Sequence, residues 1–195
     1  MKLFTSTVLL FICAALTASC ATTYTMYRDD LFDGRQLLKQ EKYGEARNLF
    51  LKASAEEKRA APFAFAATAS YKMNDLAAAE GYIGDAENAT GRNYWYLRIM
   101  GYKALILLKE KKTDEGMTVL KRYIDYYRLV YPLTTIDRVE DMWKSGQINL
   151  TQLEVLLDEQ ITYYEEELAQ AVPTGTGYYS SRLPPGAWAP RPSPD

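Results

Sequence analysis

The chain has 195 residues, and its 23 lysines and arginines against 25 aspartates and glutamates give a net charge of −2. Apolar residues make up 48% of it, which is typical of a globular protein. The near-neutral charge argues against a nucleic-acid partner, because nucleic-acid binding needs a basic surface. The absence of histidine excludes histidine-based acid–base catalysis, Ser-His-Asp triads and His-ligated zinc.

The start of the chain has the pattern of a targeting segment. Lys2 is followed by an uncharged run from Leu3 to Thr23, and small residues stand within that run. A basic start, a short apolar middle and small residues before a cut are the plan of a signal peptide. Cys20 directly after Ala18-Ser19 resembles the lipobox of bacterial lipoproteins, in which the cysteine thiol receives a diacylglycerol and the chain is cut before it. The leucine of that motif stands at Leu16, one position earlier than in the commonest pattern.

This resemblance implies that residues 1–19 are a removed signal peptide and that residues 20–26 form a lipidated tether. The second cysteine, Cys13, then leaves with the signal peptide, so the mature chain has neither a free thiol nor a disulfide. Ala21, and not aspartate, follows Cys20, which implies attachment to the outer membrane facing the periplasm. An ordinary secreted protein and an uncleaved anchor helix are the alternatives, although the apolar run is short for a span of about 20 residues.

A segment recurs within the helix-rich part of the chain. Leu37–Ala46 returns 70 residues later as Leu107–Gly116, and a weaker copy, Ser70–Ala79, begins 33 residues after the first. Apolar residues follow at spacings of three and four, which predicts a helix, a short polar turn and a second helix in each unit.

These helix pairs resemble tetratricopeptide repeats. The second helix of that family has a small residue, a large apolar residue and another small one. Two sets match this pattern fully, Ala46-Phe50-Ala53 and Ala79-Ile83-Ala86. A third set, Gly116-Leu120-Tyr123, matches it in the first two positions only. Close helix packing also needs a small residue in the first helices, at Gly34, Ala67 and Ala104. The family's first-helix tryptophan and closing proline are missing from all three units. The resemblance implies an all-α fold with about three units over residues 27–131; an unrelated helical bundle is the alternative.

Residues 132–171 are expected to form helices that cap the array. One helix is predicted from Thr135 to Lys144 and a longer one from Leu150 to Ala169, opened by a capping box from Thr151 to Glu154. Glu165-Glu166-Glu167 are expected on the exposed side of the longer helix. An apolar stripe should lie over the open end of the third unit, since a repeat array needs a terminal cap; it comprises Leu153, Leu156, Leu157, Ile161, Tyr164 and Leu168.

Residues 172–195 differ sharply in composition from the rest. Six of the eight prolines fall there, which predicts a disordered, extended tail with polyproline II character. Leu183–Pro192 is interpreted either as a linear recognition motif with Trp188 as its anchor, or as a flexible end without a single structure.

First helices of tetratricopeptide arrays line a concave groove that receives a peptide or a partner's helix. Projecting that frame onto this chain gives the groove candidates Arg28, Leu31, Arg35, Leu38, Thr68, Tyr71, Arg98, Leu105 and Leu108. The three arginines with Tyr71 would bind a carboxylate, such as a partner's C terminus, through bidentate hydrogen bonds. The alternative is that they are ordinary solvated arginines beside a small groove.

Two classes of function remain. The first is a non-enzymatic adaptor that is anchored by acyl chains and presents its groove to a periplasmic or outer-membrane assembly or export machine. Its partners would be envelope proteins and the membrane, with no nucleic acid, metal, cofactor or small-molecule substrate. The second is an envelope enzyme, or an enzyme subunit, that uses carboxylates in a cleft; a pocket with two facing acids of raised pKa would favour it.

Overall fold

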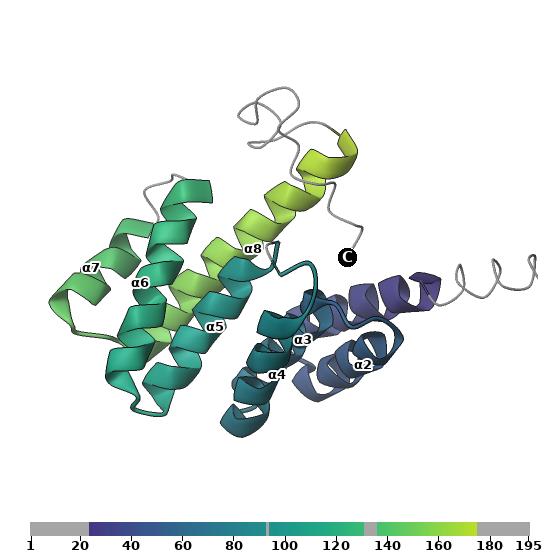
Figure 1. Ribbon diagram of the computed structural model, residues 1–195, viewed down its shortest axis with the longest axis horizontal. Coiled ribbons are helices and arrows are strands. Elements are labelled where there is room, and N and C mark those ends of the chain that lie inside the picture. Colours follow the sequence, from purple (N-terminus) through teal and green to yellow (C-terminus); the bar gives the residue numbers. More distant parts are fainter. Residues whose placement is uncertain (1–23, 93, 131–135, 175–195) are drawn as a thin grey trace, which may run out of the picture.

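The computed structural model describes residues 24–92, 94–130 and 136–174, and it is helical throughout apart from turns and one bridge between Arg59 and Thr90 (Figure 1). The predicted all-α class is confirmed for these residues. Cys20 with the signal segment, and the proline-rich tail with Trp188, lie outside them. Within the described part, no helix combines the length and the hydrophobicity that crossing a membrane requires.

The helices follow one another as packed pairs. The first covers residues 24–39 and is called the 24–39 helix. It is followed by α2 (Tyr43–Glu56), α3 (Ala60–Lys72), α4 (Leu76–Asn88), α5 (Tyr96–Lys109) and α6 (Thr113–Val130). Helix α3 packs against α2, α4 and α5, and α5 packs against α6. Two further helices, α7 (Asp137–Ser145) and α8 (Leu150–Thr174), contact α6 and α5 respectively (Figure 1).

Three turns within these pairs share one backbone geometry. Each has a non-glycine residue in the left-handed region, with φ of 61° at Glu41, 61° at Asn74 and 63° at Lys111. In each turn the amide of the next residue donates to a carbonyl five positions back, at 2.9 Å. Helices commonly end in this way, with a left-handed residue after the last turn and a hydrogen bond back to an earlier carbonyl. The three turns are 33 and 37 positions apart, so they keep the spacing of the sequence repeat.

Glycine at one of these turns is expected to stabilise the protein. A side chain costs about 1–2 kcal/mol in the left-handed region, and the extra freedom of an unfolded glycine offsets part of that gain. Lys111→Gly should therefore raise the free energy of unfolding by about 0.5–1 kcal/mol, measured by urea denaturation. Asn74→Gly is the matched control and should give less, because asparagine tolerates this conformation. A loss of stability in Lys111→Gly would contradict the conclusion that Lys111 adopts a strained left-handed conformation.

Small residues set the close approach of the paired helices, as the sequence predicted. A Cβ atom placed on Gly34 would lie 2.6 Å from the Phe50 ring, and one on Gly116 would lie 2.7 Å from Cγ of Leu108. Ala67 and Ala104 are fully buried. These positions therefore admit no larger side chain without movement of a packed neighbour.

Helix α8 begins where the sequence predicted, but with a different cap. The Asn149 side chain, and not Thr151, accepts the amide of Gln152 at 3.1 Å. Glu154, the expected partner within a capping box, binds Lys72 of α3 instead. The capping-box prediction is therefore wrong. Helix α7 ends beside Gly146, whose φ of +68° lies in the left-handed region, close to the predicted break.

The apolar stripe of α8 is buried, but the position of the helix differs from the prediction. Leu153, Leu157 and Ile161 are at most 1% exposed, and Ile161 packs against Gly101 of α5. Helix α8 also reaches beyond the third unit, since its side chains bond to α3 and to the 24–39 helix. It therefore lies across the first helices of the pairs, on the side where the sequence predicted an open groove.

Candidate functional site

The predicted groove residues fall into two groups in the structure. Tyr71, Arg98 and Leu105 are buried, at 2%, 6% and 0% exposure, and Leu31, Thr68 and Leu108 are buried with them. Arg28 is exposed, and its guanidinium is bound to neighbouring Asp29. An open groove lined by all of these side chains is therefore a wrong prediction, because α8 and the core cover most of them. Four of the predicted residues do meet around one pocket, namely Arg35, Leu38, Thr68 and Arg98.

A buried ion pair fixes α8 against α5. Glu165 accepts two hydrogen bonds from Arg98, at 2.7 Å from Nε and 2.9 Å from Nη2, and the third guanidinium nitrogen donates to Thr68 at 3.1 Å. The guanidinium carbon lies 4.2 Å from the centre of the Phe65 ring. Burial alone would lower the pKa of Arg98, but the Glu165 carboxylate outweighs it and raises that pKa. The prediction that Glu165 is exposed is wrong, since it is 6% exposed.

A second polar cluster ties α8 to α3 and α5. Lys72 donates to both Glu154 and Asp158, each at 2.5 Å, while Tyr71 donates to Glu154 and Tyr102 donates to Asp158. Burial, together with the nearby Asp158 carboxylate, raises the pKa of Tyr102 well above its usual value. The three α8 acids Glu154, Asp158 and Glu165 are thus each matched by a cation or a phenol of α3 or α5.

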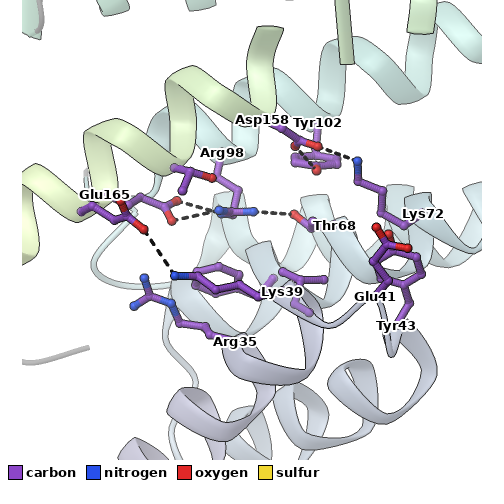
Figure 2. Close-up of a pocket in the computed structure, with 14 residues that line it drawn as sticks. Arg35, Lys39, Glu41, Tyr43, Thr68, Lys72, Arg98, Tyr102, Asp158 and Glu165 are labelled. Atoms are coloured by element: carbon purple, nitrogen blue, oxygen red, sulfur yellow. Dashed lines mark hydrogen bonds and ion pairs between the residues drawn. The ribbon is translucent and has the colours of Figure 1, made fainter. Parts of the chain in front are cut away.

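The space that α8 leaves free is a pocket of about 260 Å³ (Figure 2). It lies between α8 and the 24–39 helix, with α3 and α5 forming its floor. Four of its charged side chains are cationic and four are anionic, and Phe65, Tyr43 and Leu38 provide its apolar wall. The charged residues are Arg35, Lys39, Glu41, Lys72, Arg98, Asp158, Glu165 and Glu166.

Arg35 is the cationic pocket residue without an acidic partner in the described part of the chain. Its guanidinium carbon lies 5.2 Å from the centre of the Phe65 ring and 5.9 Å from that of Trp95. Its side chain makes no hydrogen bond or ion pair with any of the described residues. Burial lowers the pKa of Arg35, nearby Glu165 opposes this, and Arg98 adds to the lowering. A cation held on aromatic faces without an anionic partner is oriented to receive one.

A weaker ion pair lies at the opening of the pocket. Lys39 donates to Glu166 at 3.3 Å, and both side chains are about half exposed. Exposed pairs of this kind contribute little to stability, because water screens them and two long side chains lose freedom. Lys39 and Glu166 are therefore able to separate when another charged group enters.

Sequence reasoning missed the acidic half of this site. Glu154, Asp158 and Glu165 all lie on one side of α8, at separations of four and seven residues, which is the spacing of a single helix face. That spacing was a usable signal, but nothing local connects it to Lys72 or Arg98, 67 to 86 residues earlier in the chain.

The arrangement is suited to binding charged groups. Asp158, Glu165 and Glu166 each have a cationic or phenolic partner, so they are engaged rather than facing one another. Across the described ranges, no group of three or more acidic or cysteine side chains is placed to hold a metal ion. Comparisons with protein-family models, curated proteins and solved structures found no match to this chain.

Proposed function

We propose that the chain is a non-enzymatic adaptor of the bacterial envelope, anchored by lipid on Cys20 and built on tetratricopeptide-like repeats that bind a protein partner. One observation carries the proposal: the face formed by the first helices holds an amphipathic helix, α8, through acidic side chains matched to arginine, lysine and tyrosine. These contacts hold α8 in place on one side, so its exposed side is a fixed helical surface that a partner can contact.

The repeat proposal draws support from backbone geometry. The left-handed turns at Glu41, Asn74 and Lys111 recur at the sequence spacing, and α3 packs on both α2 and α5 as a stacked array requires. Gly34 and Gly116 allow close packing within two of the units. These features are expected of repeated helix pairs and are not required of an arbitrary bundle.

Because α8 fills much of the groove, the proposed partner docks over α8. The outward face of α8 exposes Val155 by 52% and Tyr163 by 48%; they are eight positions apart, which places them about 80° apart around the helix. An aromatic and a β-branched side chain next to the charged pocket mouth form a mixed surface of the kind found at transient interfaces.

Site-specific photo-crosslinking in intact envelopes tests the adaptor. A benzoylphenylalanine residue at position 163 is expected to trap one discrete partner band, and one at position 122, an exposed site on α6, is expected to trap none. Val155→Asp should reduce the yield from position 163 by roughly tenfold, because it places a charge in the apolar contact. Equal labelling from both positions, or none from 163, would count against this surface.

The lipid anchor has its own test. Cys20→Ala should abolish acylation and release the protein from the membrane fraction, because stable anchoring needs at least two lipid signals and both would be attached at this residue. Cys13→Ala is the matched control and should leave labelling with a fatty-acid analogue unchanged. Intact-mass analysis showing an unmodified thiol on Cys20 of the wild-type protein would disprove the anchor.

A further inference from the structure

The charged residues around the pocket are mostly paired with each other. Arg98 is bound to Glu165, Lys39 to Glu166, and Lys72 to Asp158. Among the charged side chains of the pocket, those of Arg35 and Glu41 make no hydrogen bond or ion pair with any described residue. After pairing, the pocket therefore offers one cation and one anion to a ligand.

These two groups lie at opposite ends of the pocket (Figure 2). The Arg35 end carries three cations, with Arg98 and Lys39, against two acids, Glu165 and Glu166. The Glu41 end carries one cation, Lys72, against the two acids Glu41 and Asp158. The lining is neutral as a whole but has one excess positive charge at one end and one excess negative charge at the other.

We propose that this pocket binds a short zwitterionic peptide, with its carboxylate on Arg35 and its ammonium group on Glu41. A dipolar pocket attracts a ligand of the opposite dipole and rejects purely anionic or cationic ligands, since either of them would meet one like-charged end. The inference goes beyond the adaptor role and requires neither the lipid anchor nor a protein partner.

Each end has suitable chemistry. The planar guanidinium of Arg35 is held by Phe65 and Trp95, so it can offer two parallel N–H groups to a carboxylate at little cost in side-chain freedom. At the other end, Tyr43 lies beside Glu41: burial and then the Glu41 charge raise the pKa of Tyr43. A carboxylate next to an aromatic ring is a favourable place for an ammonium group.

The volume of the pocket limits the length of the ligand. The pocket volume of about 260 Å³ is small, so it limits the ligand to a short peptide with small side chains. An extended peptide advances about 3.3–3.6 Å per residue, so a tripeptide holds its two terminal charges about 10 Å apart. A di- or tripeptide is therefore the ligand that we consider.

Calorimetry with the purified full-length protein tests this inference, with trialanine as the probe. Trialanine is expected to bind, while its N-acetyl form and its C-terminal amide should each bind at least tenfold more weakly, because each lacks one of the two charges. Arg35→Gln should make trialanine and its amide bind equally, and Glu41→Gln should do the same for trialanine and its N-acetyl form.

The controls separate this result from general charge effects. Lys58→Gln and Glu45→Gln remove exposed charges outside the pocket and should leave trialanine affinity unchanged. An N-acetyl peptide that binds as tightly as trialanine would overturn the proposal in favour of a site for a carboxylate alone. Failure of trialanine to bind at millimolar concentration would overturn it outright. Neither result would affect the crosslinking expected at position 163.

Discussion

Replacing Arg98 by methionine is expected to lower the free energy of unfolding by about 3–5 kcal/mol. The substitution keeps the length and the apolar packing of the side chain, but it leaves the Glu165 carboxylate buried without its two hydrogen bonds, which are 2.7 Å and 2.9 Å long. A buried charge without a partner is among the costliest single defects in a folded protein. Urea denaturation followed by circular dichroism measures the loss.

The double variant Arg98→Met/Glu165→Leu separates two contributions to stability. One is the cost of leaving the Glu165 carboxylate buried without a partner, and the other is the net contribution of the ion pair. Replacing both members by apolar residues of similar volume is often neutral, so the double variant should recover most of the stability lost by the single one. Arg28→Met is the control: its pair with Asp29 is exposed, and its loss should stay below about 0.5 kcal/mol. A double variant as unstable as Arg98→Met would show that packing, and not charge, explains the loss.

The local structure was largely predictable from sequence. The recurrence of Leu37–Ala46 indicated three helix–turn–helix units, and the turns at Glu41, Asn74 and Lys111 lie at equivalent places in them. Gly34 was predicted as a close-packing position, and a Cβ there would meet Phe50. These features depend on spacing along one helix or between neighbouring helices, which a sequence displays directly.

The position of α8 was not predictable in the same way. Its apolar stripe indicates that one side is buried, but an apolar stripe does not specify which surface buries it. The choice is made by Glu154, Asp158 and Glu165, whose cationic partners lie at least 67 residues away. Ion pairs across such distances leave no periodic signal, so the groove was expected to be open where α8 closes it.

The charged residues of the pocket were likewise predictable only in part. Arg35 was expected on the groove side from its position in the proposed repeat frame, and in the structure it lines the pocket. Arg28 was expected there too, but it lies near the solvent-exposed start of the 24–39 helix and binds Asp29. That Arg35 lacks an ionic partner whereas Arg98 has one depends on where the α8 carboxylates lie, and only the assembled fold determines that.

Alkaline unfolding is expected to be unusually steep. Burial raises the pKa of several phenols, most strongly those of Tyr71, Tyr102, Tyr123 and Tyr164, and for Tyr71 and Tyr102 the nearby carboxylates of α8 raise it further. In the unfolded chain these phenols ionise near pH 10. Above that pH the unfolded state binds fewer protons than the folded state, so stability is complete below about pH 10 and falls as the pH rises.

The expected size of this loss follows from proton counting. Each phenol that ionises only on unfolding contributes about 1.4 kcal/mol per pH unit, so four of them contribute up to about 5.5 kcal/mol per pH unit. Against a typical domain stability of about 5–15 kcal/mol, we expect cooperative unfolding within about two pH units above pH 10. Circular dichroism and phenolate absorbance, followed together, should change in the same transition.

One matched pair of variants in α6 tests whether the phenols are responsible. Tyr123→Phe keeps the buried ring but removes a titrating group and its hydrogen bond to Gln160, which is 3.0 Å long, so the slope of stability against pH should fall by about 1.4 kcal/mol per unit. Val119→Ala removes packing but no titrating group, so it should lower stability equally at every pH and leave the slope unchanged. If phenolate absorbance rises while the helices are still intact, the buried phenols ionise within the folded protein and the explanation fails.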